Sequence, residues 1–220
     1  MAEDKAENKE PAENPGEKEL REHFPTLYIT LVSIVVALAV EGLLGRLGSL
    51  SENITGLAYV LLILQIAHYI FTASIFWWIS TRWVATVPWP FGILDGISMI
   101  GLLVVFFYVS QSIGTSFNLW LLSFGILAIS SGILYRYNGR RGIEHTGRSA
   151  RLSKLHLLPS TIPLLIGLPL IWGWYLTRFV DPAYSIQIVI VTIAFAGTIA
   201  LAWADLWIWR EVSREPSRFD

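Results

Sequence analysis

The sequence predicts an all-α integral membrane protein, with six transmembrane helices in one bundle and both chain termini on the cytoplasmic side. Three observations predict this fold class. The 220 residues are 54% hydrophobic and only 15% charged, with a mean hydropathy of +0.54, whereas a soluble domain has about a quarter charged residues. Long apolar runs follow one another with mostly short gaps. The Lys and Arg residues concentrate in every second gap.

Each apolar run is long enough to cross a bilayer, which takes about 20 residues of helix. The strands of a membrane barrel would instead alternate in hydrophobicity over about ten residues, and runs such as Leu31–Val40 are almost continuously apolar. We therefore expect six spanning helices, in chain order at Pro25–Arg46, Leu57–Thr81, Phe91–Val109, Phe117–Tyr135, Thr161–Thr177 and Tyr184–Trp209.

Positive charge predicts the orientation of these helices. With both termini in the cytoplasm, fourteen of the sixteen Lys and Arg residues lie on the cytoplasmic side, and six of them fall in the one long gap at 136–156. Cytoplasmic loops of membrane proteins carry the excess of Lys and Arg, and acidic residues count for little in this rule. We expect an N-in/C-in transmembrane domain at 23–210, in a plasma (inner) membrane.

The two ends of the chain are polar. Residues 1–22 are rich in Glu, Lys, Asn and Pro, and they lack the basic start and short apolar core of a cleavable signal sequence. Such a segment buries too little apolar surface to fold alone. We expect a disordered acidic cytoplasmic tail at 1–22, with a helical start near Glu17, and a second cytoplasmic tail at 211–220.

Four ionisable side chains fall inside the expected spans: Glu41, His68, Asp95 and Asp205. A carboxylate at the bilayer centre costs roughly 2.5–3.5 kcal/mol on insertion scales, so such residues usually face the bundle interior or a water-filled cavity. In the expected orientation Glu41 lies toward the outside, His68 near the middle, and both aspartates toward the cytoplasm. On one common axis, the four would form a path for protons or small cations.

Small, polar or helix-breaking residues accompany these four. Several lie three or four positions away, on the same helix face, and proline removes a backbone donor and kinks a helix, as is common in helices that line cavities. The supporting residues are Ser33, Gln65, Thr72, Ser98, Thr198, Pro163 and Pro169. Two other interpretations stay open: such residues also form hydrogen bonds between helices, and Asp95 suits the first turn of a helix, where the dipole favours negative charge.

The long gap at 136–156 is strongly basic. Its cations would attract anionic lipid headgroups, at about 1 kcal/mol for each cation near the surface, or they would only set the topology. The expected headgroup contacts are Arg136, Arg140, Arg141, Arg148, Arg151 and Lys154.

Several function classes have no support in the sequence. The chain has no cysteine, and it lacks G-x-S-x-G, H-E-x-x-H and Walker A motifs. No lysine lies within a span, which excludes a Schiff-base chromophore. We therefore expect neither an enzyme nor a cofactor or metal site. The basic loop has no phosphate-cradling glycine motif, so we expect no nucleic-acid partner.

Two hypotheses for the function remain. The first is a small channel or carrier for protons or monovalent cations, working through the four ionisable residues in a homo-oligomer or a larger membrane complex. The second is a non-transporting membrane subunit or assembly protein, whose buried polar residues hold helices together. The first predicts that neutralising Glu41 or Asp205 stops flux, and the second predicts that it lowers the melting temperature or breaks a complex.

Overall fold

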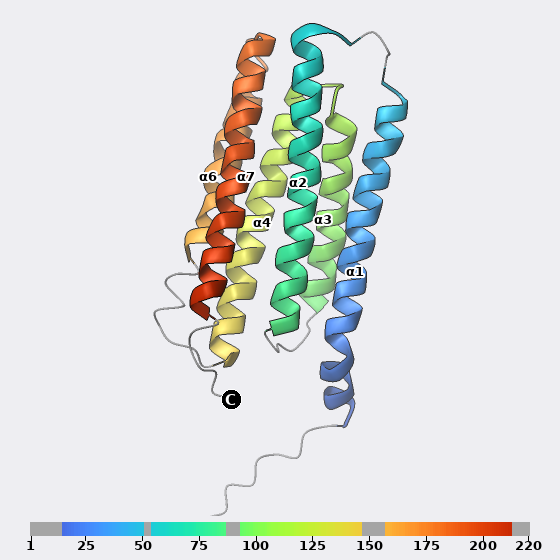
Figure 1. Cartoon of the computed structure of the whole chain (residues 1–220), viewed down its shortest axis with the longest axis vertical. Helices are drawn as coiled ribbons and strands as arrows, with labels where there is room; N and C mark the ends of the chain where they lie inside the picture. Colours follow the sequence, from blue (N-terminus) through green and yellow to red (C-terminus); the bar gives the residue numbers. More distant parts are fainter. Residues whose placement is uncertain (1–14, 51–53, 87–92, 147–156, 213–220) are drawn as a thin grey trace, which may run out of the picture.

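The computed structural model describes residues 15–50, 54–86, 93–146 and 157–212. All regular structure in these ranges is α-helical, which confirms the expected class (Figure 1). Five helices carry a segment of 20–28 residues that is long and apolar enough to cross a membrane, while the apolar part of α3 is the shorter Gly96–Ser112. The six helices are α1 (Pro15–Gly48), α2 (Gly56–Thr86), α3 (Ile93–Ser112), α4 (Phe117–Thr146), α6 (Leu157–Leu176) and α7 (Tyr184–Val212).

All six helices run beyond the apolar stretches that predict them, and α1, α2 and α4 do so by five residues or more at one end. α1 begins at Pro15, inside the polar N-terminal region, and α4 continues to Thr146, so the first part of the basic segment is helix rather than loop. α2 reaches Thr86, close to Pro88, and proline disfavours helical geometry in the residue before it.

The six helices form a closed ring. The extensive contacts join α1 to α2, α2 to α7, α7 to α6, α6 to α4, α4 to α3, and α3 back to α1. The first helix starts and the last helix ends at the same end of the bundle, hereafter the terminal end (Figure 1). The α1–α2, α3–α4 and α6–α7 connections lie at the opposite end, hereafter the far end. The interior of the ring is thus reached by side chains of helices that are distant in sequence.

The outside of the ring is apolar. Large hydrophobic side chains such as Leu165, Ile193 and Trp203 are 67–71% exposed, while His68 and Gln65 on the inside are at most 2% exposed. In water this arrangement would leave much apolar surface exposed, whereas in a bilayer the lipid tails would cover that surface. With the five long apolar helices, it supports an integral membrane protein.

α4 and α6 make the closest contact of the ring. A Cβ added at Gly167 of α6 would lie 2.8 Å from the carbonyl oxygen of Gly125 on α4, and one added at Gly132 would lie 3.0 Å from the carbonyl oxygen of Ser160. Glycine at these positions lets the two backbones touch, as small residues commonly do between membrane helices. Pro163 is buried beside this contact.

Candidate functional site along the bundle axis

The structure describes the side chains of three of the four ionisable residues expected on one path, and it separates Glu41 from the other two. His68 is 0% exposed and Asp205 is 1% exposed, so both lie inside the bundle. Glu41 is exposed on the outside of α1. Asp95 falls near the start of α3, but its side chain lies outside the described residues. The axis therefore holds His68 and Asp205, without Glu41.

Ser33 and Glu41, eight residues apart, share one face of α1, as helical spacing predicts, but this face lies outside the ring. Ser33 contacts α2, because the Trp77 indole Nε1–H donates to its Oγ at 3.1 Å. Further along the same face, a Cβ added at Gly45 would meet nothing within 4 Å. Glu41 lies on a groove between α1 and α2 of about 900 Å³ that Ser33, Trp77 and Trp78 also line. Helical spacing shows which residues share a face, but the neighbouring helices decide whether that face is inside.

His68 makes one side-chain hydrogen bond in the centre of the ring. Its Nε2 lies 2.9 Å from the Thr198 Oγ1 of α7, and that hydroxyl also donates to the Ala194 carbonyl oxygen at 3.1 Å. A threonine hydroxyl has a single proton to donate. With that proton on Ala194, Thr198 accepts from Nε2–H, and the neutral ring keeps a lone pair on Nδ1. This Nδ1 is buried and has no hydrogen-bond partner.

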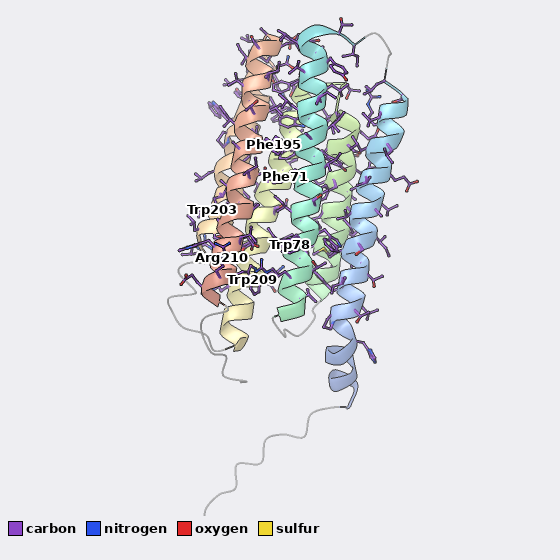
Figure 2. The ribbon with its side chains drawn as sticks, viewed as in Figure 1. Phe71, Trp78, Phe195, Trp203, Trp209 and Arg210 are labelled. Carbon is purple, nitrogen blue, oxygen red and sulfur yellow. The ribbon has the colours of Figure 1, made fainter. Side chains whose placement is uncertain are left out.

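Aromatic rings surround His68 and form a layer across the middle of the bundle. The imidazole centroid lies 4.2 Å from the ring of Phe124, 5.2 Å from that of Phe195 and 6.0 Å from that of Trp120. Phe71 lies against Phe195 with centroids 5.4 Å apart, and Figure 2 shows both at mid-height. Aromatic faces stabilise a neighbouring positive charge. Trp120 itself is fully buried, and its indole N–H has no hydrogen-bond partner.

A polar cavity lies on the far-end side of this layer. It has a volume of about 400 Å³ and includes Gln65, one helical turn before His68 on α2. Gly114, in the α3–α4 turn, has a φ of +67° and donates its N–H to the Gln65 Oε1 at 3.3 Å. Only glycine adopts this conformation readily, so the turn brings its backbone donor to the buried amide. We call this space the far-end cavity.

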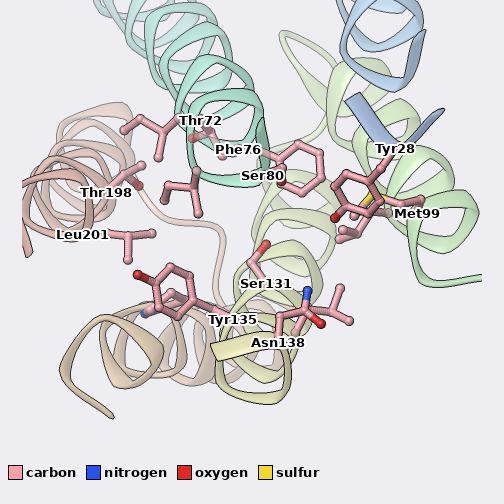
Figure 3. A pocket seen from close by; sticks show the side chains of 15 residues that line it. Tyr28, Thr72, Phe76, Ser80, Met99, Ser131, Tyr135, Asn138, Thr198 and Leu201 are labelled. Atoms are coloured by element: carbon pink, nitrogen blue, oxygen red, sulfur yellow. The ribbon is translucent and has the colours of Figure 1, made fainter. Parts of the chain in front are cut away.

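A second cavity lies on the terminal-end side of the layer. It has a volume of about 90 Å³, and residues of all six helices line it (Figure 3). Thr198, the partner of His68, lines it together with Thr72, one turn after His68 on α2. A cavity that holds water needs polar partners for it, and this one also offers Ser131, Tyr135 and Asn138 of α4. We call this space the terminal-end cavity.

Asp205 continues the polar path from the terminal-end cavity toward the terminal end. The Tyr135 hydroxyl, which lines the cavity, donates to the Asp205 Oδ1 at 2.5 Å. The other carboxylate oxygen, Oδ2, is buried with no hydrogen-bond partner. Arg82 of α2 lies in the neighbourhood of this carboxyl group, and its guanidinium lies 4.9 Å from the ring centroid of Trp209 on α7. This cluster joins α2, α4 and α7.

The remaining expected residues lie in several places. Gln65, Thr72, Thr198 and Pro163 line one of the two cavities. Pro169 is exposed, and Ser98 is half-buried without lining either cavity. Arg136 and Arg140 are exposed near the terminal end of α4. The side chain of Arg141, and all of Arg148, Arg151 and Lys154, lie outside the described residues.

Sequence reasoning missed several members of the site. Arg82 belonged to a gap in the expected topology, but α2 extends past it and carries it to Asp205. Tyr135 and Trp120 were not singled out from the sequence. The available signal was the shared helix face, since Trp120, Phe124, Ser131 and Tyr135 follow one another at spacings of four, seven and four residues.

No protein-family model, curated protein or solved structure matches this chain. Among the residues that the structure describes, no group of three His, Asp or Glu side chains could hold a metal ion.

Proposed function

We propose that this chain is an integral membrane protein that carries protons along the axis of its helix ring. The observation that carries the proposal is the position of His68. It lies in an aromatic layer between two cavities, one turn from Gln65 of the far-end cavity and hydrogen-bonded to Thr198 of the terminal-end cavity. Histidine is the side chain that most readily exchanges protons near neutral pH.

The two ring nitrogens suggest how a proton passes. Nδ1 is free to accept a proton, and Nε2–H is already bonded to the Thr198 hydroxyl. A proton taken up at Nδ1 and another released from Nε2 through Thr198 would move one positive charge across the layer. The ring is then left as the other tautomer, and a ring flip or the reverse transfer restores it. Tyr135 and Asp205 would extend the path from the terminal-end cavity.

The aromatic layer favours protons over other cations. Phe124 and Phe195 lie with their centroids 4.2 and 5.2 Å from that of the imidazole, a spacing that leaves no room for a hydrated ion. A proton needs only a chain of hydrogen-bonding groups and water. A monovalent cation would require these rings to move apart.

The proposal includes the topology that positive charge predicts. α3 would be the sixth span, with its first turns at the membrane interface, and both termini would lie in the cytoplasm of a cell with a plasma (inner) membrane. Arg136 and Arg140, exposed on α4 near the terminal end, would then contact anionic lipid headgroups.

The test is ion flux into liposomes that contain the purified protein. With an inward proton gradient, a pH dye inside the vesicles should report acidification that empty vesicles lack, and valinomycin with K⁺ should accelerate it by releasing the membrane potential. Potassium flux without valinomycin should stay at the level of empty vesicles. A well-folded protein that gives no proton flux under any gradient would contradict the proposal.

A second candidate function is a non-transporting membrane subunit. Glu41 favours it, because an exposed carboxylate on a groove of about 900 Å³ between α1 and α2 suits a neighbouring subunit's helix that brings a hydrogen-bond donor. This candidate predicts no flux, and it predicts that Glu41→Leu reduces the size of the complex in mild detergent. An unchanged size by light scattering would remove the support that Glu41 gives it.

A further inference from the structure

We propose that the far-end cavity is a binding site for a small protonated amine with an apolar body. The cavity has a volume of about 400 Å³, within the range of small-molecule sites. This inference goes beyond proton transport and does not depend on it, because it rests on the lining of the cavity alone.

Three side-chain donors of the lining are already used within the protein. The Thr115 hydroxyl donates to the backbone carbonyls of Gln111 and Ser112. The Thr177 hydroxyl donates to the Trp174 carbonyl oxygen at 2.9 Å. The Gln187 amide nitrogen donates to the Pro182 carbonyl oxygen at 2.7 Å. A ligand that needed donors from these side chains would have to break existing bonds.

The acceptors of the lining are largely unused. The Asn118 Oδ1 is buried and has no hydrogen-bond partner. The Gln65 Oε1 accepts a single long bond, 3.3 Å from the Gly114 nitrogen, and a carbonyl oxygen has two lone pairs. Asp181, in the α6–α7 connection, adds a carboxylate. An ammonium group has three donors and a positive charge, so it would satisfy Asn118 and pair with Asp181.

The charge of the lining agrees with a cationic ligand. Asp181 is the charged residue among the lining side chains of the described chain, and no Lys, Arg or His lies among them. A carboxylate or phosphate ligand would therefore be repelled by the Asp181 carboxylate.

The apolar part of the lining distinguishes an organic amine from a metal cation. Ile54, Leu61, Leu62 and Phe117 line the same cavity. Phe117 is held in place by Trp120, since their rings stack with centroids 5.8 Å apart and an interplanar angle of 11°. Apolar walls give an alkali ion nothing to coordinate, whereas they bury the carbon skeleton of an amine.

The test is isothermal titration calorimetry on the full-length protein in nanodiscs at neutral pH, with empty nanodiscs as the blank. The probes are benzylammonium, benzyl alcohol as its neutral counterpart of similar size, and sodium chloride. We expect benzylammonium to bind at least about tenfold more tightly than benzyl alcohol, as a charge-assisted hydrogen bond warrants. Equal binding of the two probes, or heat from sodium chloride with none from the amine, would overturn the assignment.

Variants locate the binding. Asn118→Leu and Asp181→Asn should each weaken benzylammonium binding about fivefold or more, while Glu41→Gln, a carboxylate change on the outside of α1, should leave it unchanged. Wild-type affinity in both cavity variants would overturn the site, provided that the melting temperature shows them folded. Because Asp181 is exposed, Asp181→Asn should fold even if Asn118→Leu does not. Proton flux measured on the same preparations keeps the two proposals apart, since amine binding without flux would contradict only the proton pathway.

Discussion

At the scale of single residues, the key interaction is the pairing of His68 with Thr198. With its own proton on the Ala194 carbonyl, the hydroxyl accepts from the imidazole, so it orients the ring and assigns the ring proton to Nε2. Hydrogen bonds between membrane helices contribute only about 0.6–2 kcal/mol each. The loss of this one should therefore affect proton transfer far more than stability.

Replacing Thr198 separates these two effects. Thr198→Val keeps the shape of the side chain but removes the hydroxyl, so proton flux should fall about tenfold or more while stability falls by only about 1 kcal/mol. Thr198→Ser retains the hydroxyl and should keep most of the flux. Liposome flux and detergent melting measure the two quantities. A valine variant with wild-type flux would place the proton path elsewhere.

Asp205 should contribute more to the stability of the bundle than Thr198. Asp205→Asn keeps an oxygen for the Tyr135 hydroxyl but replaces a carboxyl group that is 1% exposed. We expect a stability loss of about 1–3 kcal/mol, typical of disturbing a buried charged group, seen as a lower melting temperature in detergent. Asp181→Asn, at an exposed carboxylate, is the matched control and should melt like the wild type. Equal melting of both variants would show that Asp205 does not hold the helices together.

At the scale of helices, the α4–α6 contact depends on glycine. The backbone oxygen of Gly125 and the nitrogen of Ile129 lie within 3.0 Å of where a Cβ of residue 167 would stand. Backbone atoms cannot rotate away as a side chain can. At Gly197 of α7, by contrast, the atoms in the way belong to the Ile166 side chain, which has other rotamers.

Alanine substitutions at the glycines of α6, α7 and α1 should therefore lower the stability of the protein by different amounts. Gly167→Ala should cost about 1–3 kcal/mol because it overpacks two backbones, and Gly197→Ala should cost less. Gly45→Ala is the control, since its Cβ would meet nothing within 4 Å, and alanine suits a helix better than glycine. Melting temperatures in one detergent give the ranking. A Gly167→Ala variant as stable as Gly45→Ala would contradict the close contact.

The sequence predicted the helices well and their interior poorly. The length of an apolar segment depends on local residues alone. The six helices and the approximate limits of their apolar parts could therefore be predicted from it. Which face of a helix lies inside depends on the other helices. That is why Glu41 was expected on the axis and lies outside, and why Tyr135 was not connected with Asp205 before the ring was known.

At the scale of the whole molecule, the ring places polar groups on its axis and apolar groups outside. Helices that are neighbours in the ring are often distant in sequence, as α2 and α7 are. His68 and Thr198 come from these two helices and meet between the two cavities. The ring thus gives the axis a narrow aromatic layer, at which the proposed path would distinguish a proton from a larger ion.

The absence of cysteine in the sequence makes the topology directly testable. In intact cells, a membrane-impermeant maleimide should label Thr55→Cys at the far end. It should label Arg140→Cys, near the terminal end, only after the cells are lysed. Both positions are exposed in the structure, so poor labelling would not come from burial. The reverse pattern would contradict the N-in/C-in orientation.

The most direct test of the central claim is proton flux in liposomes that contain either His68→Leu or Glu41→Gln, compared with the wild type. His68→Leu interrupts the axis at its narrowest layer, and Glu41→Gln neutralises a carboxylate on the outside of the ring. The account predicts that His68→Leu reduces flux to the level of empty vesicles, while Glu41→Gln keeps the wild-type rate. Wild-type flux in a folded His68→Leu variant, or loss of flux in Glu41→Gln alone, would contradict a proton path through the centre of the bundle.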